Sequence, residues 1–169
     1  TTSARIEAGT SSTHTMVKAK GDVAVNASEK VLVELESSGG AIGAVGVGGW
    51  VAYAQYKGQV NATVGNYSDL EVGSALSVTA KLGEKDNKDS SVKSIGVSAS
   101  LLGGFAGTFA FLDVSGDANA LVGDAVSLKR HANVNAGTPN VTVTAERDLD
   151  ASVTSIGAAS SGYGAIGIS

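Results

Sequence analysis

The segment Asn-Ala-Thr-Val-Gly-Asn at residues 61–66 recurs as Asn-Ala-Leu-Val-Gly-Asp at residues 119–124. The stretches before the two copies also match, because Gly-Trp-Val-Ala-Tyr at residues 49–53 aligns at the same offset with Gly-Thr-Phe-Ala-Phe at residues 107–111. The same offset, counted back from the first copy, leads to residues 4–6. There a small residue, a residue of any type and a β-branched residue again follow one another. Self-similarity at a fixed period is typical of repeat architectures. The sequence therefore predicts a repetitive fold.

Two further motifs recur at other spacings. Residues 23–27 (Val-Ala-Val-Asn-Ala) return as residues 76–80 and 141–145, and Ala-Ile-Gly-Ala at residues 41–44 returns as Ser-Ile-Gly-Val at 94–97 and Ser-Ile-Gly-Ala at 155–158. In the first of them apolar and polar residues alternate, as in a strand with one buried face. Helical periodicity is nearly absent. We therefore expect an all-β chain in which loops have been gained and lost between fixed strands.

A unit of about 58 residues that holds three similar strand segments divides into rungs of about 19–20 residues. Such a rung is too short for a propeller blade or an immunoglobulin sandwich and suits one turn of a parallel β-solenoid. The sequence thus predicts a right-handed parallel β-helix of about 8 rungs. Residues 1–169 would form one solenoid segment, a fragment of a longer repetitive protein.

The composition agrees with a narrow, stacked interior. Gly, Ala, Val, Ser and Thr make up three-fifths of the chain, and hydrophobic residues account for 43%. The net charge of −4 argues against a partner that is a nucleic acid, and the absence of cysteine excludes disulfides and thiolate metal sites. No signal peptide or apolar run long enough to span a membrane is recognised, so we expect no membrane insertion by this segment.

The chain also resembles a known class of proteins. Residues 39–53 form a Gly-rich alternating strand pair, residues 61–65 a small-x-β-branched-Gly step, and residues 75–80 a strand that ends in Val-Thr-Ala. This order is similar to the repeat region of large bacterial type V secreted exoproteins, the filamentous-haemagglutinin-like adhesins and leukotoxin-type passengers. The resemblance implies a surface-exposed shaft of a bacterial adhesin or toxin. The lack of cysteine fits, because such passengers cross the outer membrane unfolded.

No catalytic, cofactor or metal site is expected from the sequence. His14 and His131 lack acidic neighbours at ligand spacing, and no nucleophile elbow is present. Solenoid polysaccharide lyases would need charged residues on one face of neighbouring rungs. The candidates for that role are Asp113, Asp117, Asp124, Arg147, Asp148 and Asp150, which we interpret as solvated residues. Asp86, Asn87 and Asp89 offer oxygen ligands for calcium but lie among lysines.

The aromatic residues suggest the candidate contact site. Trp50, Tyr53 and Tyr56 lie close together, and Phe105, Phe109 and Phe111 sit at or near the equivalent positions one repeat later. They either fill the interior or form an exposed strip that grips a sugar or a protein. Because strand residues alternate, we expect Val51 and Tyr53 to face inward. Trp50 and Tyr56 are then the candidate exposed contact residues.

These observations predict a structural and adhesive segment without catalysis, either secreted or on the bacterial cell surface and anchored through another part of the parent chain. The expected partner is a host-cell surface protein or glycan, and end-to-end self-association is a further expectation because solenoid ends carry unpaired strand edges. Two alternatives stay open. The chain is a self-assembling extracellular filament subunit that stacks end to end, or a β-helix polysaccharide lyase or hydrolase.

Overall fold

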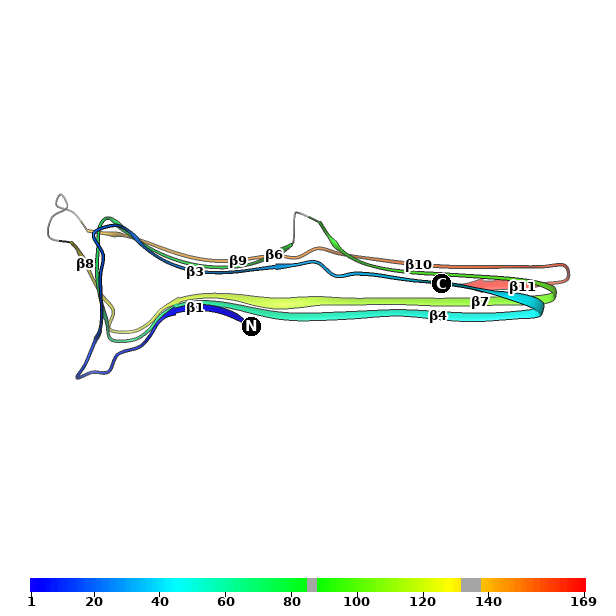
Figure 1. Ribbon diagram of the computed structural model, residues 1–169, viewed down its shortest axis with the longest axis horizontal. Coiled ribbons are helices and arrows are strands. Elements are labelled where there is room, and N and C mark those ends of the chain that lie inside the picture. Colours follow the sequence, from blue (N-terminus) through cyan, green and yellow to red (C-terminus); the bar gives the residue numbers. More distant parts are fainter. Residues whose placement is uncertain (85–87, 132–137) are drawn as a thin grey trace. The chain divides into compact units, whose positions relative to one another are not determined.

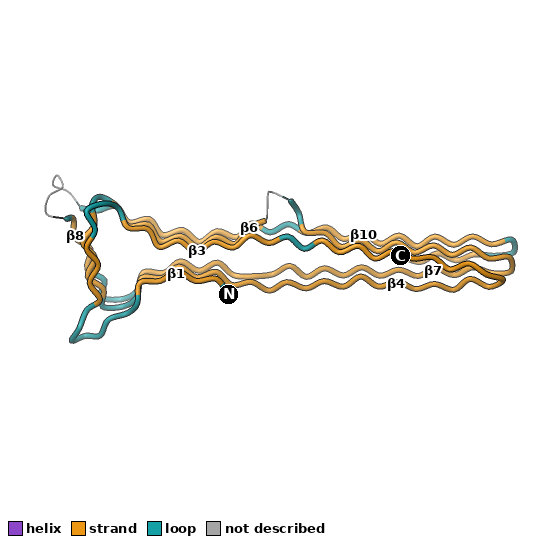
Figure 2. Tube along the Cα trace, viewed as in Figure 1, coloured by secondary structure: helices purple, strands orange, loops and turns teal. Residues whose placement is uncertain are grey.

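The regular elements of the protein are β-strands. The computed structural model describes residues 1–84, 88–131 and 138–169, and Figure 2 shows these residues as strands joined by loops. The strands are β1 (Thr2–Ile6), β2 (Thr15–Lys18), β3 (Val23–Val31), β4 (Glu34–Val64), β5 (Ser68–Val72), β6 (Ala75–Glu84), β7 (Ser90–Val122), β8 (Ser127–Arg130), β9 (Asn140–Asp148), β10 (Ala151–Ser161) and β11 (Ala165–Ile168). The prediction of an all-β chain is confirmed.

The strands pair in parallel, each with its equivalent one repeat away (Figure 1). Thr2 of β1 pairs with Val60 of β4, and Asp69 of β5 pairs with Ser127 of β8, so both pairs keep the offset of the main sequence repeat. The offset is shorter between β2 and β5, where Thr15 pairs with Ser68. It is longer between β6 and β9, and in every case a strand meets its partner after one whole sequence repeat.

This pairing corrects the expected size and number of rungs. The predicted rung of one-third of a repeat is wrong, and so is the predicted count of about 8 rungs, because no described strand pairs with a segment so near in sequence. The strands of one repeat are divided among three sheets, with the orders β1-β4-β7-β10, β2-β5-β8 and β3-β6-β9. Each similar strand thus stacks on its counterpart in the next repeat, and the described chain contains about three repeats.

The recurring motifs mark the register of these pairs. Leu76 pairs with Val141 and Ala80 with Ala145, as the alternating motif predicts, and Ile95 pairs with Ile156. The copy Ala-Ile-Gly-Ala at residues 41–44 is not in register with the copy Ser-Ile-Gly-Val at residues 94–97. A Cβ atom on Gly40 would lie 3.5 Å from Val97 Cγ2, which places residue 40, and not residue 44, beside Val97.

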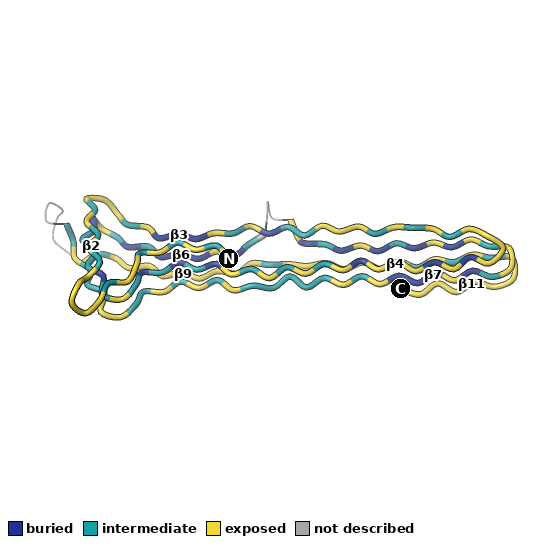
Figure 3. Tube along the Cα trace, turned by 60° about the horizontal axis from the view of Figure 1, so that its bottom comes forward, coloured by how far each residue is buried: buried dark blue, intermediate teal, exposed yellow. Residues whose placement is uncertain are grey.

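The chain divides into two compact units. Unit 1 comprises Thr1–Lys30, Lys57–Gly83 and Gly116–Asp148, and unit 2 comprises Val31–Tyr56, Glu84–Ser115 and Leu149–Ser169. In unit 1, parts of β1, β4 and β7 form one parallel sheet beside the β2-β5-β8 and β3-β6-β9 sheets. Residues of differing burial alternate along these strands (Figure 3), and the buried ones form an aliphatic core. Its fully buried members are Val60, Ala62, Val64, Leu70, Val72, Leu76, Val78, Ala80 and Leu82.

The corners of unit 1 have the same backbone geometry in successive repeats. Tyr67 and Ala125, which occupy equivalent positions of two repeats, both have positive φ angles, of 53° and 52°. The left-handed region is uncommon for residues other than glycine and costs energy. The Tyr67 amide donates to the Asp124 carbonyl at 3.0 Å, so the two corners also hydrogen-bond to each other.

Unit 2 has two strand layers and a narrow interior. β4 and β7 each bend, and β10 is followed by β11, so that the segments before and after the bend form the two layers (Figure 1). Thr108 Oγ1 and Ser155 Oγ lie 2.8 Å apart across this interior. A Cβ atom on Gly157 would lie 2.3 Å from the Ile168 carbonyl oxygen. The buried residues of unit 2 are mostly glycine, alanine, serine and threonine, because layers so close leave little room for large side chains. The indole of Trp50 fits where it packs on glycines.

Candidate functional site

Each of the two histidines lies beside a carboxylate from another repeat. His14 Nδ1 lies 3.2 Å from Asp69 Oδ2, and His131 Nδ1 lies 2.8 Å from Glu71 Oε1. Asp69 and Glu71 are far from the histidines in sequence, so the spacing of residues along the chain did not predict these contacts. Within the described part of the chain, no group of three or more His, Cys, Asp or Glu side chains could hold a metal ion.

The β2-β5-β8 sheet also carries a shallow depression, whose lining includes Asp69 and Glu71. It has a volume of about 180 Å³, and its lining includes Met16, Lys18 and Lys129. Lys18 Nζ lies 3.6 Å from Glu71 Oε2, so Glu71 contacts both a lysine and a histidine. Within the depression Lys18 and Glu71 form an ion pair, as side chains on a solvated sheet face commonly do.

The charged candidates for lyase chemistry have structural contacts or face the solvent. Asp113 accepts a 2.8 Å hydrogen bond from Gln55 Nε2, and Arg147 donates a 3.2 Å hydrogen bond to the Gly116 carbonyl. Asp117, Asp124, Asp148 and Asp150 are exposed. Of the calcium candidates, Asp89 is exposed, and Asp86 and Asn87 lie outside the described residues.

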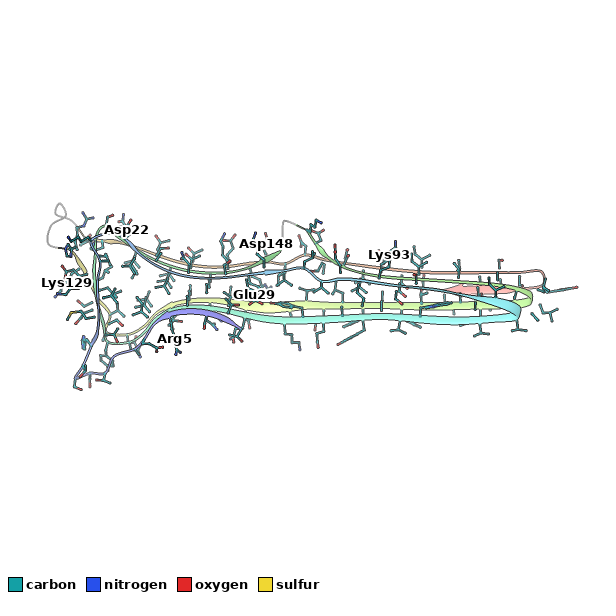
Figure 4. The ribbon with its side chains drawn as sticks, in the orientation of Figure 1. Arg5, Asp22, Glu29, Lys93, Lys129 and Asp148 are labelled. Atoms are coloured by element: carbon teal, nitrogen blue, oxygen red, sulfur yellow. The ribbon has the colours of Figure 1, made fainter. Side chains whose placement is uncertain are left out.

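Asp22 is an acid with a clear structural role. The Oδ1 atom of Asp22, a residue labelled in Figure 4, accepts hydrogen bonds from the Ser74 hydroxyl at 2.7 Å and from the amides of Ser74 and Ala75, both at 2.9 Å. The Ser74 hydroxyl, followed by these two amides, holds the pKa of Asp22 below its ordinary value. The carboxylate thus fixes the start of β6 from the preceding repeat.

Because the pKa of Asp22 is lower in the folded chain than in the unfolded chain, its ionised form stabilises the fold. This stability is fully present above the ordinary carboxyl pKa and is lost as the pH falls through the lowered folded value. We therefore expect Asp22→Asn to unfold more easily than the wild type at pH 7 and to show a weaker loss of stability on acidification, measured by urea unfolding from pH 7 to pH 2.

The matched control for this prediction is Ser74→Ala, which removes the hydroxyl donor and keeps the carboxylate. It should weaken the acid dependence of the wild type but change nothing further in the Asp22→Asn background. Equal acid dependence in the wild type and in Asp22→Asn would contradict the assigned role.

Trp50 and Tyr56, the candidate exposed contact residues, lie on the inward side of β4. Both are half-buried, and both lie an even number of residues from the buried Ala52, which places them on the same side of the strand. The indole of Trp50 packs on glycines, because added Cβ atoms on Gly39 and Gly96 would lie 1.6 and 2.2 Å from its ring atoms. In the next repeat Thr108 takes the place of Trp50 and is fully buried. A role of Trp50 and Tyr56 in binding stays a prediction.

The expectation that Val51 and Tyr53 face inward is wrong. Val51 is 68% exposed and Tyr53 58% exposed, whereas Ala52 between them is 1% exposed. At these positions the small Ala52 takes the inner side of the narrow unit 2, and the larger Val51 and Tyr53 point to solvent. The ring of Tyr53 stacks on that of Phe111, with a centroid distance of 5.2 Å and an interplanar angle of 6°.

The exposed side of β4, β7 and β11 in unit 2 is the candidate functional site, which we name the aromatic face. Large apolar side chains, each between 38% and 68% exposed, gather on it. Its members are Val45, Val47, Val51, Tyr53, Phe105, Phe109, Phe111, Ile166 and Ile168. Between them stand glycines such as Gly49 and Gly107, so no charged side chain interrupts the face.

The packing of Trp50 can be tested by fluorescence, because it is the only tryptophan of the chain. Gly39→Ala adds a Cβ atom where the indole Nε1 now lies, and we expect the displaced ring to show a red-shifted emission maximum. Gly40→Ala is the control, since its Cβ atom would meet Val97 Cγ2 at an ordinary 3.5 Å. An unchanged spectrum in Gly39→Ala would show that the indole does not pack on Gly39.

Comparisons of the chain with protein-family models, curated proteins and solved structures found no match. In the part of the chain that the structure describes, no helix is long and apolar enough to cross a membrane.

Proposed function

We propose that the chain is a structural and adhesive segment without catalytic activity, built as a right-handed parallel β-solenoid. It would belong to the shaft of a secreted or surface-exposed bacterial protein, anchored through another part of the parent chain. The observation that carries this proposal is the parallel, in-register pairing of equivalent strands from successive repeats. Stacking of this kind produces quasi-one-dimensional proteins, in which each repeat contacts its neighbours.

Side-chain ladders between repeats support a mechanical role. Asn119 Nδ2 donates to Asn61 Oδ1 at 3.1 Å, and the amide of Asp124 donates to Asn66 Oδ1 at 2.9 Å. Lys81 Nζ lies 2.7 Å from Glu146 Oε2 on neighbouring strands of one sheet. Equivalent positions thus bond to one another from repeat to repeat, and separating two repeats requires that these bonds and the backbone ladders break together.

The location and the partner are inferred from the resemblance to type V secreted exoproteins. The absence of cysteine is compatible with export in an unfolded state. The proposed partner is a host-cell protein or glycan that contacts outward side chains and loops. End-to-end stacking into filaments and polysaccharide cleavage stay predictions, because no arrangement of the described residues favours either over the shaft role.

Single-molecule force spectroscopy on the chain, held between two handle domains, tests the shaft role. Repeats that unfold one at a time should release steps of roughly 20 nm, since an extended chain spans about 3.5 Å per residue. Proteolysis of the folded chain should be slow except at loops. Unfolding at low force without steps, or cleavage of polyuronides by the purified chain, would overturn the proposal.

A further inference from the structure

The aromatic face is a bare side of a parallel sheet. Its residues lie on β4, β7 and β11, which run parallel, with Ile166 beside Phe105 and Ile168 beside Gly107. The inner side of this sheet is covered by the second layer of unit 2, as the contact between Thr108 and Ser155 shows. The large apolar side chains on the outer side are 38% to 68% exposed, so no described part of the chain covers that side.

The exposed apolar area is large for a monomer. From the exposed fractions of its nine side chains, the face presents on the order of 900 Å², whereas the largest patch of a typical monomer measures about 300–600 Å². A standard protein interface buries about 800 Å² on each partner. The aromatic face therefore offers the area that one half of a stable interface needs.

The side chains of the aromatic face favour a protein partner over a glycan or a lipid surface. Apart from the Tyr53 hydroxyl, its side chains carry no hydrogen-bonding group, and a glycan site needs such groups to orient the sugar. The stack of Tyr53 on Phe111 also covers one face of each ring, which reduces the ring area open to a sugar. A lipid surface is less suited, because the face lacks the lysines and arginines that accompany interfacial binding.

A second copy of the chain fits these properties. Two uncharged faces meet without repulsion between like charges, and sheets pack face to face at about 10 Å with interdigitating side chains. The ring of Phe105 lies close to Gly107, since an added Cβ atom on Gly107 would be 3.5 Å from the ring. We propose that two copies of the chain associate through their aromatic faces. This inference goes beyond the proposed shaft role, since it concerns lateral pairing.

Sedimentation equilibrium of the purified chain over a range of concentrations tests the inference. The wild type should form dimers at micromolar concentrations, and Phe109→Lys should raise the dimer dissociation constant at least about 30-fold, because the charge would be buried once in each copy. Val97→Lys is the matched control. Val97 is 50% exposed on the other layer of unit 2, so this variant should change the constant less than about twofold.

Far-UV circular dichroism of both variants shows whether they keep the strand content of the wild type. A wild type that stays monomeric at 100 μM overturns the inference, as does a dimer that Phe109→Lys leaves intact while its fold is retained. A monomer that binds neutral phospholipid vesicles or an immobilised glycan through the same face also overturns it. None of these results bears on the unfolding steps that test the shaft role.

Discussion

Val78→Asp is expected to destabilise the chain by at least about 4 kcal/mol, because it places an unpaired charge in an aliphatic interior. Val78 is completely buried between Leu76 and Ala80 on β6, and it pairs with Val143 of β9. These neighbours are all aliphatic, so none of them can donate a hydrogen bond to the new carboxylate. Urea unfolding followed by circular dichroism measures the loss, and we expect most of the variant to be unfolded at 25 °C.

Thr79→Asp is the matched control for Val78→Asp. It introduces the same charge one residue further along β6, on the outer side of the strand, where Thr79 is only half-buried. Its effect should stay within about 1 kcal/mol. If the two variants lost similar amounts of stability, the assignment of the inner and outer sides of β6 would be wrong.

The second large effect is expected at a corner glycine. Gly73 is buried, and a Cβ atom on it would lie 2.5 Å from the Lys20 carbonyl oxygen and 2.9 Å from the Gly21 carbonyl carbon. Both are backbone atoms of the preceding repeat, which cannot move aside without breaking the 2.7 Å hydrogen bond from the Gly73 amide to the Gly21 carbonyl. We expect Gly73→Ala to cost about 2–4 kcal/mol in the free energy of unfolding.

Gly21→Ala provides the comparison for Gly73→Ala, because Gly21 occupies the same corner one repeat earlier. An added Cβ atom on Gly21 would have no neighbour within 4 Å. The substitution should therefore change stability by less than about 0.5 kcal/mol. A loss in Gly21→Ala as large as that in Gly73→Ala would point to backbone conformation, and not to close stacking of repeats, as the reason for glycine.

The recurring segments allowed the strand type and much of the register to be predicted. The match of residues 61–66 with 119–124 appears in the structure as the hydrogen bond from Asn119 to Asn61 and as the bond from the Gly123 amide to the Val64 carbonyl. The number of rungs could not be predicted in the same way. Similar strands of one repeat can either stack directly on one another or pair only with their counterparts in the next repeat, and both arrangements give the same alternation along the chain.

The direction of side chains in unit 2 was mispredicted for a related reason. Alternation separates Val51 and Tyr53 from Ala52 and Ala54, but it does not say which pair faces inward. Large apolar residues normally do, and here the short distance between the layers reverses that rule. The acidic partners of His14 and His131 were likewise beyond prediction, because sequence spacing carries no information on contacts between repeats.

The unequal offsets between paired strands have a consequence for how such a chain can change. β3 and β4 are separated by two residues, whereas five residues separate β6 from β7 one repeat later, and yet the strands on either side keep parallel pairing. The length difference between these two repeats thus falls between the strands. A peptide epitope spliced between β6 and β7 should thus be displayed without disturbing the neighbouring layers, which makes this junction a natural point for grafting.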